Sequence, residues 1–209
     1  SGGTAASLGA TLAAIAKEPS LGRIMASPFG LTPGFEGPAQ PPANEPMFDE
    51  ATGQWATPFV MAVINTKNVH RTNLLLGHPY GADLVYDEMV LTGPGDQGKG
   101  VAEYLAKTPM IGTPNDPKPG EGPTPEQRAN GHYDVLFIGE WPDGQTLRYG
   151  VKGRYDPGYG STSRMIAETG LALREASVGG GIATPGALVG EALVQRLQQF
   201  AEISFAVED

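Results

Sequence analysis

The chain has 209 residues, which is long enough to bury about 70% of its unfolded surface in a single domain. It carries 14 basic and 23 acidic residues, and the net charge of −9 excludes the broad basic surface of a nucleic-acid or anionic-membrane binder. Cysteine is absent, so disulfides, thiolate nucleophiles and cysteine metal sites are excluded, and a reducing cytoplasm is the expected location. No apolar run approaches the ~20 residues that span a bilayer. The start at Ser-Gly-Gly-Thr, without methionine, is typical of a piece of a longer protein.

The first half of the chain alternates regular patterns with proline-rich stretches. Thr4–Ala16 has the apolar spacing of a helix, and an irregular arm follows at about residues 27–56. So long an irregular stretch is usually functional, or an arm that lies on another domain. A second proline-rich arm covers about residues 108–125. The elements expected between the arms are a strand at Thr57–Ile64, a helix from an Asn65-Thr66 cap to Leu76, a strand at Ala82–Leu91 and a helix at Gln97–Ala106.

The second half predicts a hairpin, two helices and a closing strand. The strands Tyr133–Glu140 and Thr146–Arg154 flank Asp143-Gly144, a strong turn signal. The elements that follow are a helix at Ser161–Ala176, a helix from Thr184-Pro185 to about Phe200 and a strand at Ile203–Val207. We therefore expect one α+β domain over residues 1–209. Its mixed, mostly antiparallel sheet of about five strands would have the helices packed on one face.

The run Gly93-Pro-Gly-Asp-Gln-Gly98 matches the glycine pattern of a dinucleotide-binding turn between a strand and a helix. Two observations argue against that function. The second arm lies where a second strand and a ribose-binding carboxylate should follow. Asp87 and Glu88 interrupt the preceding strand, which a doubly wound core would keep apolar. A purely structural turn is the favoured interpretation.

The run Asp156-Pro-Gly-Tyr-Gly-Ser-Thr-Ser163 lies where a strand ends and a helix begins. N–H groups at a helix start attract carboxylate or phosphate groups. Tyr159, Ser161 and Thr162 are therefore candidates for contacts with a substrate. An ordinary capped helix after a tight turn explains the same residues equally well, and spacing alone does not separate the two interpretations.

A third segment carries Asn65, Lys67 and Arg71. The two cations are four residues apart on one helix face, where they repel each other by about 0.2–0.5 kcal/mol. Both also lie in the N-terminal half of the helix, the unfavourable end for positive charge. This arrangement indicates an anionic partner. An Asp or Glu of the same chain is the commoner case, and a substrate carboxylate or a cofactor phosphate is the functional one, for which the Arg71 fork is best suited.

Other catalytic chemistry has little support in the sequence. His70, His78 and His132 show no metal-ligand spacing, and packing is the favoured role of His70. No nucleophile-elbow, Ser-x-x-Lys or zinc-protease motif occurs, which argues against a stand-alone hydrolase. The residues point to no single catalytic acid or base.

Several segments in order resemble the saccharopine dehydrogenase-like oxidoreductases, and the resemblance spans nearly the whole chain. The segments are PFVMAVINTKNVHRTNLLLG (58–77), YGADLVYDEMVLTGPGDQGKG (80–100), PKPGEGPTPEQRANGHYDVLFIG (117–139), DPGYGSTSRMIAE (156–168) and GGGIATPGALVGEALVQRL (179–197). Mycobacterial trans-acting enoyl reductases share this kind of second domain. The resemblance implies an upstream Rossmann domain, outside this chain, that binds NAD or NADP.

The resemblance also implies that this chain covers the nicotinamide, contacts a small-molecule substrate and forms a homodimer. Two hypotheses follow. In the first, the parent protein transfers hydride to or from a carbonyl, imine or activated alkene, and this part alone is inactive and binds no cofactor. In the second, the chain is a non-catalytic dimerisation or ligand-binding module.

Overall fold

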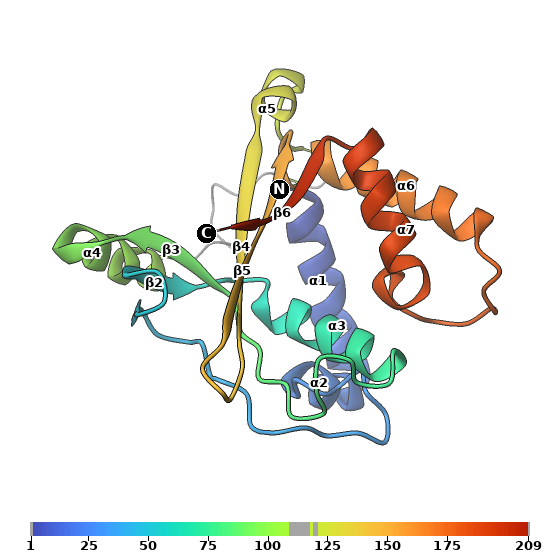
Figure 1. Ribbon diagram of the computed structural model, residues 1–209, viewed down its shortest axis with the longest axis horizontal. Coiled ribbons are helices and arrows are strands. Elements are labelled where there is room, and N and C mark those ends of the chain that lie inside the picture. The colour runs from blue at the N-terminus through green and yellow to red at the C-terminus, as the bar shows by residue number, and fades with distance from the viewer. Residues whose placement is uncertain (1, 109–117, 119–120, 209) are drawn as a thin grey trace. The chain divides into compact units, whose positions relative to one another are not determined.

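The computed structural model describes residues 2–108, 118 and 121–208, and Figure 1 shows its elements. Within these residues the chain is α+β, with seven helices and two separate three-stranded sheets. Every strand pair in both sheets is antiparallel. The chain divides into two compact units, a first unit at Gly2–Glu121 and a second unit at Gly122–Asp209.

The first unit contains a small sheet in the order β1-β2-β3. Its elements in chain order are α1 (Gly2–Lys17), α2 (Pro19–Ala26), β1 (Met47–Asp49), β2 (Gln54–Pro58), α3 (Ala62–Leu75), β3 (Met89–Gly93) and α4 (Gly95–Lys107). Helix α4 packs on β2 and β3, where Ala56 and Ala102 are buried. The hydroxyl of Thr57, also buried, donates to the carbonyl of Ala102 at 3.1 Å and joins strand to helix.

The proline-rich arm of the first unit folds against α3. The ring of Phe29 lies 4.5 Å from the ring of His70, and both residues are buried. Thr32, buried as well, donates its hydroxyl to the carbonyls of Phe29 and Phe35. The arm therefore supplies an apolar covering for one face of α3, which explains why a stretch without regular structure holds its position.

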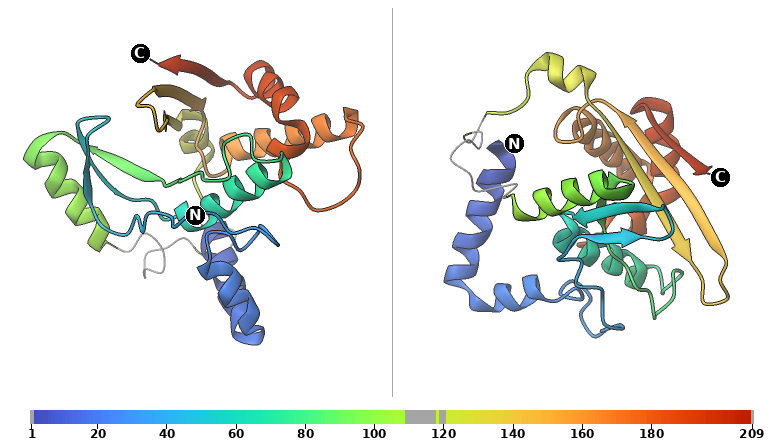
Figure 2. Two further views of the ribbon diagram at one scale, coloured as in Figure 1. Left: turned by 60° about the horizontal axis from the view of Figure 1, so that its bottom comes forward. Right: turned by 90° about the vertical axis from the view of Figure 1, so that its left-hand side faces the viewer.

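The second unit is a three-stranded sheet with two helices. Its elements are α5 (Pro125–Asn130), β4 (His132–Glu140), β5 (Thr146–Arg154), α6 (Gly160–Glu175), α7 (Pro185–Phe200) and β6 (Ile203–Glu208), with the sheet order β4-β5-β6. The β4–β5 hairpin forms a long ribbon in Figure 2, in register from His132↔Arg154 to Glu140↔Thr146. Leu197, Ala201 and Ile203 form the centre of its core.

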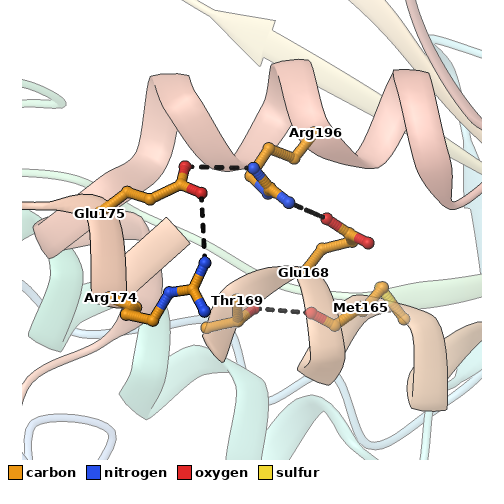
Figure 3. Close-up of polar contacts among 6 residues, drawn as sticks. All are labelled: Met165, Glu168, Thr169, Arg174, Glu175 and Arg196. Carbon is orange, nitrogen blue, oxygen red and sulfur yellow. Dashed lines mark hydrogen bonds and ion pairs between the residues drawn. The ribbon is translucent and has the colours of Figure 1, made fainter. Parts of the chain in front are cut away.

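A charged network joins α6 to α7 (Figure 3). Arg196 on α7 donates through Nε to Glu168 Oε2 at 2.9 Å, and its Nη2 lies 2.9 Å from the same oxygen. Its Nη1 donates to Glu175 at 3.2 Å. The side chains of Arg196 and Glu168 are only 21% and 14% exposed, so this fork is shielded from solvent. A shielded, multiply bonded Arg–carboxylate pair fixes the two helices in register.

The expected single mixed sheet of five strands is wrong, although the α+β class is confirmed. The expected strand at Ala82–Leu91 is regular only from Met89. Before that point Gln40 accepts from the Tyr86 amide and donates to the Leu84 carbonyl, so a side chain takes the place of a neighbouring strand. The backbone hydrogen-bonding groups of Leu84 and Tyr86 thus find a partner although these residues join no sheet.

The expected helix start at Asn65-Thr66 is also wrong. Strand β2 ends at Pro58, and α3 begins at Ala62 with Met61 as its N-cap. The Asn65 amide already donates to the Met61 carbonyl at 2.9 Å, so Asn65 lies in the first turn rather than before it. Proline ends the strand because it has no N–H to donate to a ladder, and the chain turns into the helix directly.

Candidate functional site

Helix α3 carries the first group of candidate residues, Asn65, Lys67 and Arg71. Among the described residues, the ion pairs that the structure shows do not include Lys67. Lys67 Nζ donates to the Val63 carbonyl one turn earlier, and Arg71 Nη1 donates to the Leu31 carbonyl of the arm at 3.2 Å. A backbone carbonyl of its own helix therefore holds Lys67, and Arg71 is bonded to the arm.

Lys67 is the least usual residue of the group, because it is only 4% exposed. Burial lowers the pKa of its ammonium group, and no nearby carboxylate counters that effect. His70 and Asn73, also buried, lie on the same stretch of α3. Asn73 is satisfied by the Gly81 carbonyl and the Tyr80 amide, whereas His70 Nε2 has no hydrogen-bond partner. Within the described residues, this helix face thus holds a buried polar atom, His70 Nε2, that has no hydrogen-bond partner.

His70 fulfils the packing role expected from the sequence. Its ring packs against the ring of Phe29 with the two planes tilted by 46°, and burial lowers the pKa of the imidazole, which favours the neutral form. A neutral, buried imidazole is a poor proton donor to solvent. Its unpaired Nε2 atom also lowers the stability of the fold.

Asn65 belongs to an acidic cluster that the sequence did not associate with it. Its amide donates to Glu88 Oε2 at 2.9 Å, and the Tyr86 hydroxyl donates to Glu88 Oε1 at 2.6 Å. Burial, followed by the bond to Glu88 and the charges of Glu88 and Asp87, raises the pKa of Tyr86. Burial also raises the pKa of Asp87, with the charges of Asp49 and Glu88 as further causes. The signal for this cluster was present in the sequence as two carboxylates that interrupt an apolar run.

Tyr159, Ser161 and Thr162, the second group, lie at the start of α6 in the second unit. The carboxylate of Asp156 accepts from the amides of Gly158, Tyr159 and Gly160, the shortest of these bonds being 2.6 Å to Gly160. The turn before α6 therefore already binds a carboxylate of its own chain at the position where the sequence placed a substrate anion.

The hydroxyls of this second group are also engaged. Ser161, fully buried, shares a 2.9 Å hydrogen bond with the Tyr133 hydroxyl. Thr162 donates to the Pro157 carbonyl at 2.6 Å. Tyr159 lines a cavity of about 380 Å³, whereas Ser161 and Thr162 do not. Of the three residues, Tyr159 is thus the one placed beside open space. The α3 group lies in the first unit and the α6 group lies in the second.

The glycine run Gly93–Gly98 is the structural turn that the sequence favoured. Gly93 and Gly95 have φ values of +106° and +64°, which favour glycine, and they connect β3 to α4. A Cβ on Gly98 would lie 1.9 Å from the Gly93 carbonyl oxygen, so the third glycine permits a close backbone approach. Strand β3 pairs antiparallel with β2, whereas a dinucleotide fold needs a parallel crossover.

Two further properties of the described residues bear on function. No three His, Asp or Glu side chains in this part of the chain are placed to hold a metal ion. None of its helices combines the length and the apolar character needed to cross a membrane.

Comparison with known proteins gives relatives over nearly the whole chain. It is 31% identical over 225 residues to a Mycobacterium tuberculosis protein provisionally named a trans-acting enoyl reductase, covering 94% of this chain and 54% of that protein. It is 28% identical over 229 residues to the trans-acting enoyl reductase of Mycobacterium ulcerans, covering 95% and 54%. It is 30% identical over 227 residues to that of Mycobacterium bovis, covering 94% and 54%.

The chain therefore spans about half the length of the curated relatives it matches. No family model matches it. No solved structure matches it either.

Proposed function

We propose that this chain is the substrate-side part of an NAD(P)-dependent oxidoreductase that reduces an activated alkene, such as an α,β-unsaturated acyl group. The observation that carries the proposal is the similarity of 94% of the chain to proteins named trans-acting enoyl reductases. The resemblance to saccharopine dehydrogenase-like oxidoreductases supports the same class of chemistry, hydride transfer, and the second-domain position of the chain.

In this proposal a nicotinamide cofactor supplies the hydride and binds to a Rossmann domain outside these residues. Gly93–Gly98 does not fit the cofactor, because its strand is antiparallel and Gly98 lies against the Gly93 carbonyl. The residues of this chain then have two tasks, to position the substrate and to exclude water from the reacting carbons.

Helix α3 is the proposed anchor for the substrate. Lys67 is buried without a carboxylate partner in the described residues, and Arg71 is one turn further along. A negatively charged substrate group would pair with Lys67, and the planar guanidinium of Arg71 is suited to contact the same group. Tyr159, Ser161 and Thr162 stay proposed substrate contacts of the second unit.

The proposal is tested with the longer protein and the isolated chain in parallel. We expect the longer protein to oxidise NADH or NADPH when given an α,β-unsaturated ketone or thioester, and not when given the saturated analogue. The isolated 209 residues should be inactive and should show no micromolar heat of binding with NAD(P)H in calorimetry. Equal turnover of the unsaturated substrate and its saturated analogue would contradict alkene reduction. Micromolar binding of the cofactor to the isolated chain would restore Gly93–Gly98 as a cofactor site.

A second candidate function is a non-catalytic dimerisation or ligand-binding module. The observation that favours it is the open end of one face of the β4-β5-β6 sheet, beyond Val151 and Phe205, which pack on the core. Phe137, Tyr149 and Val207 are aligned across the three strands, and Phe137 and Val207 are exposed. Val135 and Leu147, exposed as well, extend this face along the hairpin. We propose that it is the surface through which the protein forms a homodimer. Sedimentation at tens of micromolar should show a dimer, and Phe137→Glu should return it to a monomer.

A further inference from the structure

The second unit contains a cavity of about 380 Å³ between α5, the β5–α6 turn and the first turns of α6. Its lining includes Arg128, Tyr155, Tyr159, Ser163 and Arg164, two cations and two aromatic rings in a protein of net charge −9. The volume lies at the lower end of the range for small-molecule sites. Cations concentrated beside aromatic faces indicate an anionic ligand with a flat or apolar part.

Arg164 is fixed in orientation by its own chain. Its guanidinium carbon lies 3.7 Å from the centre of the Tyr155 ring, and Nη1 donates to the Gly160 carbonyl at 2.6 Å. A guanidinium has five N–H donors, so this single bond leaves donors for a ligand. Because the group is already ordered, a ligand would lose little side-chain entropy on binding it.

Arg128 is the second cation, and it differs from Arg164 in its surroundings. It is exposed on α5, and among the described residues its guanidinium has no acceptor. The backbone around it is nevertheless rigid. The Asp156 amide donates to the Arg128 carbonyl at 3.0 Å, and a Cβ on Gly131 would lie 2.5 Å from the Asp156 backbone. Helix α5 is thus held directly against the β5–α6 turn.

The carboxylates near the cavity are already engaged. Asp156 accepts from the amides at the start of α6. Glu202 accepts from the Tyr155 hydroxyl, which is the main cause of its lowered pKa, and it also pairs with Arg154 at 3.1 Å. Glu202 therefore offsets the charge of Arg154 and also lies within electrostatic range of Arg164, whereas the ion pairs among the described residues include neither Arg128 nor Arg164.

Backbone strain marks the same place. Tyr155 and Glu202 have φ values of +77° and +54°, conformations that non-glycine residues seldom adopt, and their side chains are bonded to each other. Such conformations cluster at functional sites. Tyr155, which has one of these conformations, carries the ring that lies against the Arg164 guanidinium.

We propose that this cavity is a binding site for an organic phosphate, with Arg128 and Arg164 on the phosphate oxygens and Tyr155 and Tyr159 beside the attached organic group. A phosphate ester offers several oxygens in different directions, which suits two guanidinium groups that come from different helices. The site goes beyond the proposed reduction, and its test measures binding without turnover. A protein that binds the phosphate but reduces no alkene would refute the proposed function and leave this inference standing.

The test uses phenyl phosphate, benzoate and benzyl alcohol with the 209-residue chain, observed by NMR and calorimetry. We expect phenyl phosphate to bind with a Kd of about 0.1–1 mM and to shift the amide signals of residues 155–164. Benzoate should bind more weakly, and benzyl alcohol should not bind. Arg128→Gln and Arg164→Gln should each weaken phenyl phosphate about tenfold, the usual loss for a charge-assisted hydrogen bond.

Arg174→Gln is the matched control, because it removes an exposed arginine of the same helix α6 that does not line the cavity. It should leave binding within about twofold of the unmodified chain. If Arg164→Gln fails to fold, Arg128→Gln decides the question alone. Absence of binding, an unchanged Kd in Arg128→Gln, or benzoate that binds as tightly as phenyl phosphate would each overturn the inference.

Discussion

The two units differ in how they accommodate a shielded cation. In the second unit Arg196 lies between Glu168 and Glu175, with three of its nitrogens within 3.2 Å of a carboxylate oxygen. In the first unit Lys67 is more deeply buried, yet among the residues that the structure describes its ammonium is bonded only to a carbonyl of its own helix. A shielded cation that is paired with carboxylates has a structural role in the fold. A buried charge without a carboxylate lowers stability, and such residues are candidates for function.

The largest effect is expected where the paired cation is removed. Arg196→Ala leaves Glu168 shielded and unpaired between α6 and α7, so we expect it to lower the free energy of unfolding by about 2–3 kcal/mol. Urea denaturation followed by circular dichroism measures the change. Arg174→Ala is the control, because Arg174 is 74% exposed and 3.9 Å from Glu175, and it should cost less than about 0.5 kcal/mol. Equal losses in the two variants would show that shielding of the pair contributes nothing.

A second charge of the second unit, Asp156, should behave as a structural group rather than as a ligand site. Asp156→Ala removes the acceptor for the first amides of α6, and we expect a loss of about 1–2 kcal/mol in the same assay. Asp143→Ala, in the hairpin turn, removes an exposed carboxylate bonded only to Gln145 and should cost less. A stable Asp156→Ala chain would mean that the turn keeps its amides available for an external anion.

The unpaired cation of the first unit should respond in the opposite direction. Lys67→Met keeps the shape of the side chain and removes a buried charge, so we expect stability at pH 7 to rise by about 1 kcal/mol. The pKa of Lys67 is lowered in the folded state, so the unfolded chain binds more protons in the window between the folded pKa and 10.5. The native lysine therefore becomes less costly as pH rises, and the advantage of Lys67→Met should shrink through that window. Destabilisation at pH 7 would show that Lys67 has a structural partner.

The smallest expected effect concerns His70. Burial lowers its pKa in the folded chain, so between that pKa and 6.5 the unfolded chain binds more protons and stability falls as pH falls. His70→Phe keeps a ring against Phe29 and cannot be protonated. Between pH 7 and 5 it should lose less stability than the native chain, by on the order of 0.5 kcal/mol. His132→Gln, at an exposed histidine, provides the control. Parallel pH profiles for the native chain and His70→Phe would contradict a buried neutral imidazole.

The same difference between the units explains what the sequence could predict. The hairpin, α6, α7 and β6 of the second unit follow local signals, namely Asp143-Gly144, the helical stripe after Gly160 and the Thr184-Pro185 start. Helix α5 was not predicted from the sequence, because the prolines around it are typical of an irregular arm. Thr124 and Gln127 nevertheless form a capping box at its start. The errors of the first unit arose from long-range contacts. Gln40 replaces a strand beside Tyr86 and Leu84, 46 and 44 residues away in sequence, and no local pattern encodes that.

The sequence could predict which residue types were candidates for the site, but not how buried they are or what they bind. The sequence identified Lys67 and Arg71 as an unfavourable pair, but it could not show that Lys67 is buried or that Asn65 binds Glu88. It placed an anion at the start of α6 without showing that Asp156 already occupies that position. No sequence pattern predicts the cavity lined by Arg128 and Arg164, because these two residues are far apart in sequence and come together only where α5 packs against the β5–α6 turn.

The most direct test of the central claim, that this chain holds the substrate while another part holds the cofactor, is the kinetics of Arg71→Ala in the longer protein. Arg71→Lys retains the charge without the fork, and Arg23→Ala removes an exposed arginine elsewhere in the same unit. We predict that Arg71→Ala raises the KM for the unsaturated substrate by about tenfold or more. The KM for NAD(P)H should stay unchanged, with Arg71→Lys intermediate and Arg23→Ala like the native protein. A higher KM for the cofactor with an unchanged KM for the substrate would contradict the account.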